Sequence, residues 1–261
     1  MIENVSPKKF LGQHFLIDEN ISKKIVNSFS LKEFDNIVEI GPGKGALTKY
    51  LFEYSDKLIL VEYDTESVEY IKSSFKIHNP NIIKQDFLKY NLKDVLSQTS
   101  KNLIIGNFPY NISSQIIFKI LENYLLVDNL VGMFQKEVAE RIISKPNSKE
   151  YGIISVKTQL LYDVKILFDV SPNVFFPKPR VNSSVISMTK KKNVNINFDV
   201  KLFDRLVKLS FQQRRKKIKN SLKKLDLKEN ILEDSIFGLR PEQLSVNDFI
   251  RLTQKITNET I

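Results

Sequence analysis

Residues 107–110, Asn-Phe-Pro-Tyr, could hold an amino group for alkylation. They follow an apolar run at 103–106 that predicts a buried strand entering a sharp loop. The exocyclic amine of adenine is a poor nucleophile because its lone pair is delocalised into the ring. A catalyst must therefore accept hydrogen bonds from both N–H groups. The side-chain oxygen of Asn107 and a backbone carbonyl of the turn are suitable acceptors.

The last two residues of this loop suit the same role. Pro109 has no N–H and a fixed φ, which would help to present the loop carbonyl. Tyr110 offers a flat face on which a base can stack. So short a pattern is also compatible with a turn that only ends a strand, and its interpretation depends on what lies upstream.

A glycine-rich loop upstream indicates a nucleotide-binding site. The apolar residues 38–40 lead into Gly41-Pro42-Gly43-Lys44-Gly45, and Glu62 closes the next apolar strand 21 residues after Gly41. In doubly wound folds, an acid at about this spacing accepts the hydroxyls of a ribose. The segment lacks the P-loop pattern and spaces its glycines as GxGxG, not GxGxxG. This favours a cofactor with one ribose and no phosphate, S-adenosylmethionine, although a purely structural turn stays open.

A further acid falls at the end of the following strand. Residues 82–84 predict a short strand that leads to Asp86 and Phe87, which could accept from the adenine amine of the cofactor and cover its ring. The glycine loop, Glu62, Asp86 and Asn107 thus come at successive strand ends. Ligands of open parallel sheets bind beyond that carboxyl edge, so we expect a single site there.

Together these motifs resemble the KsgA (RsmA) rRNA adenine dimethyltransferases, within the wider group that includes the Erm resistance methyltransferases. The resemblance covers nearly the whole chain. Residues 9–16, KFLGQHFL, are similar to the family's GQ(N/H)FL element, which folds over the cofactor, with His14 where many members have Asn. The resemblance implies an S-adenosylmethionine site lined by His14, Leu16, Gly41, Gly43, Glu62, Asp86 and Asn107.

Residues 175–181, FFPKPRV, match the family's FxPxPxV element. The resemblance implies that its first aromatic residue, Phe175, stacks on the target base opposite Tyr110. The catalytic residues so implied are Asn107, Pro109, Tyr110 and Phe175. The target adenine would be flipped or single-stranded, because its N6 atom cannot reach a buried cofactor from within a helix. Residues 211–217 and 239–245 resemble segments of the KsgA branch and favour it over the Erm branch.

Positive charge is concentrated in one part of the chain. Between Lys190 and Lys224, thirteen Lys and Arg face two Asp, a net +11 in a chain whose total is +10. Leucines and isoleucines recur there at roughly helical spacing, so the cations should line a solvated face of packed helices. We expect this face to contact nucleic acid, with Arg214, Arg215, Lys216 and Lys217 as candidates. The alternative is a face that only confers solubility.

Alternating apolar strands and helices predict an α/β fold of the Rossmann-like, class I S-adenosylmethionine-dependent methyltransferase type. Its mostly parallel sheet would have helices on both faces. We expect a helix near 18–29 and parallel strands near 36–40, 57–62, 82–84, 103–106 and 130–135. Strands near 164–169 and 185–188 could add an antiparallel edge. Residues 148–162 are ambiguous, with helix favoured.

The segment beyond residue 197 is expected to be all-helical. We therefore divide the chain into a cofactor-binding catalytic domain with an N-terminal lid element, residues 1–192, and a small basic RNA-binding domain, residues 193–261.

Composition excludes several classes of site. The chain has no cysteine, so disulfides and thiolate metal sites are excluded. Its two histidines, His14 and His78, lie far apart, so we expect no metal and place His78 in a loop. No signal peptide and no run of 18 apolar residues is evident. We expect a soluble, cytoplasmic monomer.

Three functions remain to be compared. A KsgA-type enzyme would dimethylate two adjacent adenosines in a small-subunit rRNA hairpin within a partly assembled subunit. An Erm-type enzyme would act on one adenine of large-subunit rRNA. A non-catalytic nucleic-acid-binding factor could share the fold, but the presence of Glu62, Asn107 and Tyr110 favours catalysis.

Overall fold

The computed structural model describes residues 5–75, 82–192, 194, 196–225 and 227–260 of the chain. The predicted loop position of His78, and Asn193, where we expected the second domain to begin, lie outside the described residues. The described residues form two compact units. The first contains residues up to Ala139 and Asp163–Lys190, and the second contains Glu140–Tyr162 and the chain from Lys191 onward.

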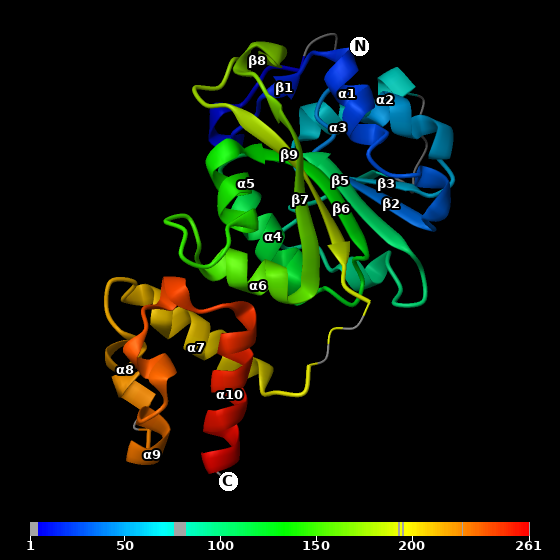
Figure 1. The fold of residues 1–261 in the computed structure, drawn as a ribbon. Coiled ribbons are helices and arrows are strands. Elements are labelled where there is room, and N and C mark those ends of the chain that lie inside the picture. Colours follow the sequence, from blue (N-terminus) through cyan, green and yellow to red (C-terminus); the bar gives the residue numbers. More distant parts are fainter. Residues whose placement is uncertain (1–4, 76–81, 193, 195, 226, 261) are drawn as a thin grey trace. The chain divides into compact units, whose positions relative to one another are not determined.

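A seven-stranded sheet forms the centre of the first unit (Figure 1). The pairs from β4 to β6 are parallel, and β9 runs antiparallel to β6. From one edge to the other the strands are β4 (Ile82–Lys84), β3 (Leu58–Glu62), β2 (Asn36–Ile40), β5 (Asn102–Asn107), β6 (Asn129–Gln135), β9 (Ser183–Lys190) and β7 (Tyr162–Val170). The expected doubly wound sheet with an antiparallel edge is confirmed, and each expected parallel strand is present to within one residue at its ends.

The central strands are apolar along their length because the sheet is covered on both faces. Every residue of β5 before Asn107 is buried, as is most of β6. Asp18 caps the first α-helix by accepting a hydrogen bond from the Ile21 N–H, so this helix begins where the sequence predicted. The helices that begin in this unit are α1 (Glu19–Val26), α2 (Thr48–Leu51), α3 (Thr65–Phe75), α4 (Ser113–Glu122) and α5 (Lys136–Ile143). Its 3-10 helices are Lys9–Leu11, Leu31–Glu33, Phe52–Tyr54, Leu92–Asp94 and Pro172–Val174.

A second, two-stranded sheet was not predicted. Strand β1 (Phe15–Leu16) pairs antiparallel with β8 (Phe175–Phe176), and the two lie side by side in Figure 1. The Ile17 N–H extends the ladder by donating to the Val174 carbonyl at 2.9 Å. This ladder ties the GQHFL element to the FFPKPRV element, which lies about 160 residues further along the chain.

The second unit is helical around its own hydrophobic core. Its α-helices are α6 (Ile153–Leu161), α7 (Val200–Gln212), α8 (Ile218–Ser221), α9 (Glu229–Leu232) and α10 (Val246–Thr260). Its 3-10 helices are Lys223–Leu225, Ser235–Gly238 and Pro241–Gln243. The predicted helix within 148–162 and the predicted all-helical segment are confirmed. Among the described residues, no helix combines the length and the apolar character needed to cross a membrane.

The division between units differs from the expected division at residue 192. Residues 140–162 belong to the second unit because Tyr151 and Val156 are buried in the same core as Phe203 and Phe249. Hydrophobic periodicity shows that a helix has an apolar face, but it does not show which core that face joins.

Candidate active site

A cavity of about 270 Å³ lies at the carboxyl edge of the parallel strands. The strand ends, the glycine loop and the N-terminal segment all contribute to its lining. It brings together nine of the predicted site residues: His14, Leu16, Gly41, Gly43, Glu62, Asp86, Asn107, Pro109 and Tyr110. Phe175 is absent from the described residues that line it.

The glycine loop is closely covered by the N-terminal segment. Gly43 adopts a φ of 55°, which favours glycine, and a Cβ built there would lie only 3.0 Å from the Phe15 ring. Its N–H donates to Oε2 of Glu62 at 3.1 Å. The glycine is therefore required both for the turn and for the close approach of Phe15.

Glu62 is held firmly at the end of β3. The residue is 6% exposed, and its Oε1 accepts from the Asp64 N–H at 2.8 Å while Oε2 accepts from Gly43. Burial raises the pKa of this carboxyl group, and the two backbone donors oppose that shift. Fixed in this way, the carboxylate keeps lone pairs for a ligand in the cavity.

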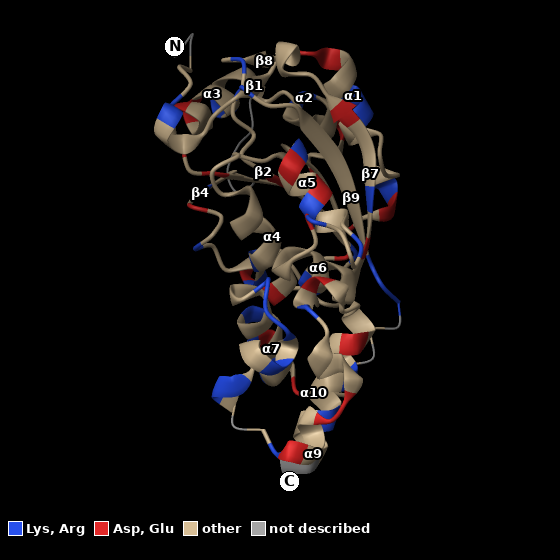
Figure 2. Ribbon diagram, turned by 60° about the vertical axis from the view of Figure 1, so that its left-hand side comes forward, with Lys and Arg blue, Asp and Glu red and all other residues tan. Residues whose placement is uncertain are grey.

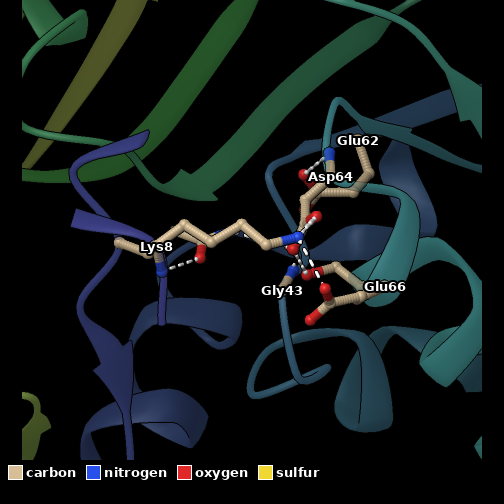
Figure 3. A network of polar contacts seen from close by, with 7 residues as sticks. Lys8, Gly43, Glu62, Asp64 and Glu66 are labelled. Carbon is tan, nitrogen blue, oxygen red and sulfur yellow. Dashed lines mark hydrogen bonds and ion pairs between the residues drawn. The ribbon is translucent and has the colours of Figure 1, made fainter. Parts of the chain in front are cut away.

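A network of polar contacts joins Glu62 to the N-terminal segment (Figure 3). The Lys8 ammonium forms an ion pair with buried Asp64 and another with Glu66 at 3.1 Å. Gln13 Nε2 also donates to Asp64, at 3.4 Å. Burial raises the pKa of Asp64, but the hydrogen bonds from Lys8, Ser67 and Gln13 outweigh it and hold this pKa below its usual value. The network fastens the N-terminal segment next to the carboxylate that we expect to bind ribose.

Glu39 lies in the cavity lining and was missed by the sequence analysis. It is 2% exposed, and its Oε2 accepts from the Thr48 hydroxyl at 2.7 Å. Burial raises the pKa of Glu39 to about 8, so the side chain is mostly neutral at pH 7. An acid within the apolar run of β2 was the available signal, since acids are seldom fully buried without a partner.

Asp86 and Phe87 follow β4. Asp86 Oδ1 accepts from the Leu88 N–H at 2.9 Å, which fixes the carboxylate and leaves its second oxygen for another donor. Phe87 is buried and contributes to the cavity lining. This arrangement suits a ring with an exocyclic amine.

The loop at 107–110 is anchored by its second residue. The Phe108 ring is buried in a space left by two glycines, since a Cβ on Gly132 would lie 2.1 Å from it and one on Gly106 would lie 2.6 Å from it. Asn107 Nδ2 donates to the His14 carbonyl at 2.9 Å. Because the amide nitrogen is committed to His14, the Oδ1 atom is left to accept from another group.

The loop also presents a free carbonyl. The Pro109 carbonyl accepts from the Ile112 N–H at 3.2 Å, and the Tyr110 carbonyl accepts from the Ser113 hydroxyl at 3.2 Å. The Phe108 carbonyl accepts no hydrogen bond from any described residue. Among the described residues, this carbonyl and Asn107 Oδ1 are therefore two acceptors that the loop leaves available.

Tyr110 is covered on one face by His14. The two rings stack with centroids 5.2 Å apart and an angle of 30° between their planes. The Tyr110 hydroxyl is hydrogen-bonded to the Ser183 hydroxyl, and burial raises the pKa of Tyr110. A hydrogen bond between His14 Nδ1 and the Pro177 carbonyl, at 2.6 Å, holds the imidazole in place. Only the opposite face of Tyr110 is left for a base.

Phe175, which we expected to stack on the target base, is buried in this structure. It is 3% exposed, because it pairs with Leu16 in the two-stranded sheet and packs into the core of the first unit. Its neighbour Phe176 is 59% exposed. In this structure, the free ring of the FFPKPRV element belongs to Phe176.

The four basic candidates lie in the second unit and have different surroundings. Arg214 is half-buried, donates to the Ser148 carbonyl at 3.1 Å and lies 3.6 Å from the Glu242 carboxylate. Arg215, Lys216 and Lys217 are exposed and form no ion pair with a described residue. Figure 2 shows basic segments over and beyond α7. Three of the four candidates are thus free to meet a ligand.

The two acids between Lys190 and Lys224 are both engaged with other residues of the second unit. Asp199 caps α7 by accepting from the N–H groups of Lys201 and Leu202, and Asp204 pairs with Lys157 at 3.0 Å. They therefore offset little of the exposed positive charge.

The family model for ribosomal RNA adenine dimethylase matches residues 4–260 of this chain. The chain belongs to this family. A ribosomal RNA small subunit methyltransferase A of Flavobacterium johnsoniae is 53% identical over 255 residues, which cover 98% of this chain and 97% of that protein. The expected family is thereby confirmed.

Two solved structures resemble this adenine dimethylase in fold. A dimethyladenosine transferase from Plasmodium falciparum has a TM-score of 0.81 and 24% identity, and the match covers 95% of this chain and 99% of that one. The 23S rRNA methyltransferase ErmE has a TM-score of 0.62 and 22% identity, with 93% and 99% covered. These matches confirm the expected S-adenosylmethionine-dependent methyltransferase fold with a helical C-terminal part.

The cavity of this adenine dimethylase fits a nucleoside cofactor with a positive charge. Glu62 and Asp86 line it as acids beside the mostly neutral Glu39, and Lys44 is the only Lys or Arg among its described lining residues. A phosphorylated ligand would need cations or several free N–H donors, and the N–H of Gly43 already serves Glu62. The residues present therefore fit S-adenosylmethionine better than a nucleotide.

Proposed function

We propose that this chain dimethylates the N6 amines of two adjacent adenosines in a hairpin of small-subunit rRNA, with S-adenosylmethionine as the methyl donor. The observation that carries the proposal is the Asn107 amide. Its nitrogen is committed to the His14 carbonyl, so its oxygen is free beside the acid-lined cavity. The family match and the relative named for the small subunit support this choice of substrate.

The cofactor-binding residues act through fixed acceptors. When bound, S-adenosylmethionine supplies an electrophilic methyl group on its sulfonium. Glu62 would accept from the ribose hydroxyls, Asp86 from the adenine amine, and Gly41 and Gly43 allow the ligand close to the backbone. His14 and Leu16 belong to the segment that covers the cavity.

The amine of the target base would be oriented by two acceptors. Asn107 Oδ1 and the Phe108 carbonyl each accept one N–H, which directs the nitrogen lone pair towards the methyl group. Positive charge develops on the nitrogen as the new bond forms, and both acceptors stabilise it. No strong base is required, because the proton leaves after transfer.

A neutral acceptor suits the second methylation. The monomethylated amine has only one N–H left, so one of the two acceptors loses its partner. An unpaired neutral amide oxygen costs less than an unpaired carboxylate. We infer that Asn107, being neutral, allows the monomethylated base to rebind.

Tyr110 is the stacking residue that the geometry supports. The flipped adenine would lie on the Tyr110 face opposite His14. Phe175 would have to leave its place in the core to reach a base, and its packing instead supports β8. Phosphate contacts are assigned to Arg215, Lys216 and Lys217, while Arg214 positions its own segment.

Methyl transfer to separated ribosomal subunits tests this proposal. Small and large subunits that lack the modification are incubated with labelled S-adenosylmethionine, and their nucleosides are analysed. Dimethyladenosine from the small subunit alone is the expected result. Label in the large subunit would indicate an Erm-type enzyme. Binding without label in either would indicate a non-catalytic factor.

A further inference from the structure

Two segments beside the cavity are rich in cations and contain no acid. Residues 5–17 and 171–182 include no Asp or Glu. Their cations Lys9, Lys178 and Arg180 are exposed, and none forms an ion pair with a described residue. The described lining of the neighbouring cavity differs, since it holds the acids Glu62 and Asp86 and a single lysine, Lys44. The outer surface of these segments therefore suits a polyanion, whereas the cavity does not.

The two segments form one structural element. Their strands pair as β1 and β8, and His14 contacts the Pro177 carbonyl. Residues directly opposite each other in an antiparallel ladder share a face. Leu16 and Phe175 are one such pair and belong to the hydrophobic core, and Leu16 also borders the cavity. Phe15 and Phe176 are the other pair, and Phe15 lines the cavity against Gly43.

Phe176 therefore lies on the same face of the ladder as the lining residue Phe15, with 59% of its surface exposed. Phe10 is 75% exposed and comes just before the lining residues Leu11 and Gly12. Its carbonyl accepts from Asn111, the residue after Tyr110, at 3.4 Å. Exposed rings among unpaired cations, next to the proposed methyl-transfer site, indicate an interaction surface.

An exposed aromatic ring can compensate for the stacking that is lost when a base is flipped out of the RNA. When the target adenosine leaves its stack, the neighbouring base loses its stacking partner. An aromatic ring at the mouth of the cavity can replace that partner, and cations beside it can neutralise the flanking phosphates. Aromatic rings among cations are the usual composition of a surface for single-stranded nucleic acid.

We propose that Lys9, Phe10, Phe176, Lys178 and Arg180, here called the lid surface, bind the RNA nucleotides next to the target adenosine. Phe176 stacks on the neighbouring base, and the three cations contact phosphates. This assignment rests on the proposed function. It differs from the role of the exposed residues Arg215, Lys216 and Lys217, because a ring beside the cavity selects how the target is presented, whereas those cations supply affinity.

Binding of a fluorescent RNA tests the lid surface without requiring turnover. The probe is a short RNA hairpin with two adjacent adenosines in its loop and 2-aminopurine as the base next to them. Stacking on Phe176 should quench the 2-aminopurine when the wild-type protein binds. Phe176→Ala should abolish the quench and weaken binding about tenfold, as expected for the loss of one stacked base. Phe176→Tyr, which keeps a ring, should restore both.

Matched controls separate the lid surface from general effects. Leu125→Ala removes another exposed apolar side chain and should leave the quench unchanged. Replacing Lys178 and Arg180 by Ala should lower the salt slope of RNA binding by about 1.4, the value for two phosphate contacts in a single strand. Lys32→Ala, at the amino edge of the sheet, should not change it. All variants should bind S-adenosylhomocysteine like the wild type.

The outcomes distinguish this proposal from the proposed function. A Phe176→Ala variant that keeps the full quench and the wild-type affinity would overturn the lid surface, even if methylation of small subunits succeeds. A Phe176-dependent quench in a protein that methylates neither subunit would support the lid surface while the proposed function fails.

Discussion

The cavity and the second unit of this protein handle charge in opposite ways. In and beside the cavity, Glu39, Glu62 and Asp64 are at most 6% exposed, and each accepts fixed hydrogen bonds. In the second unit, Arg215 and Lys216 are exposed and unpaired among the described residues. Buried groups interact strongly and only in one geometry, whereas exposed charges interact weakly and are screened by salt. The cavity should therefore bind one small molecule specifically, and the basic surface should bind a polyanion in a graded, salt-dependent way.

The largest expected effect comes from Asn107→Ala. It removes the acceptor that orients the amine and stabilises charge in the transition state, so single-turnover methyl transfer should fall by roughly 100-fold to 1000-fold. The rate is measured at saturating S-adenosylmethionine and RNA, so that weaker binding cannot account for it. A rate close to that of the wild type, with cofactor bound, would show that Asn107 has no role in the chemistry.

Charge reversal in the second unit should have the next largest effect. Replacing Arg215, Lys216 and Lys217 by Glu should weaken binding to rRNA by about 100-fold at low salt and lower the slope of affinity against salt. Arg214→Gln is the matched control. Because Arg214 is engaged with Ser148 and Glu242, its loss should reduce stability by at most about 1 kcal/mol and leave the slope unchanged. An unchanged slope in the triple variant would indicate that these residues only confer solubility and do not contact RNA.

Glu62→Gln should weaken the binding of the cofactor and leave RNA binding unchanged. A neutral amide replaces a carboxylate that accepts charge-assisted hydrogen bonds, so affinity for S-adenosylhomocysteine should fall by about 10-fold to 100-fold in calorimetry. The loss should be nearly independent of salt, since the group is buried. Weaker RNA binding by this variant in the absence of cofactor would be inconsistent with the division of roles.

Lys8→Met should have a smaller effect on the same ligand. Asp64 loses its ion-pair partner and the N-terminal segment loses one fastening, so cofactor affinity should fall by about fivefold. Lys9→Met removes the adjacent, unpaired lysine and should leave cofactor affinity unchanged. Equal losses in the two variants would mean that Lys8 acts only through its general positive charge.

Glu39 should make the stability of the folded protein, rather than ligand binding, depend on pH. Its pKa of about 8 in the folded protein exceeds the ordinary value of 4.5, so the folded state holds a proton that the unfolded state has lost. The stability contribution is complete below the ordinary pKa and is lost as pH rises to about 8, by at most about 1.4 kcal/mol per pH unit. Urea unfolding at several pH values should show this fall in the wild type. The fall should be reduced in Glu39→Gln, and equal curves for the two proteins would contradict it.

Much of the cavity lining could be predicted from the sequence, because ligands of parallel sheets bind at the carboxyl ends of the strands. The carboxyl ends of parallel strands meet at one edge, so Glu62, Asp86 and Asn107 could be expected to converge once their strands were recognised. The strands themselves follow from continuous apolar runs in a sheet that is covered on both faces.

The contacts that the sequence did not predict are those without periodicity or a motif. Strands β1 and β8 have two residues each, too few for alternation to show that Phe175 is buried and Phe176 exposed. The ion pair of Lys8 with Asp64 joins residues 56 positions apart. The sequence could not distinguish Arg214 from its basic neighbours, because its partner, the Ser148 carbonyl, lies in a loop before α6 that is distant in the sequence.

The most direct test measures both ligands on both kinds of variant. Affinity for S-adenosylhomocysteine and for the rRNA hairpin is determined by calorimetry, at low and high salt, for Glu62→Gln and for the Arg215, Lys216 and Lys217 triple variant. We expect Glu62→Gln to lose affinity for the cofactor but not for RNA. We expect the triple variant to lose affinity for RNA but not for the cofactor, and its RNA binding to depend less on salt. Loss of cofactor affinity in the triple variant, or of RNA affinity in Glu62→Gln, would contradict separate cofactor and RNA sites.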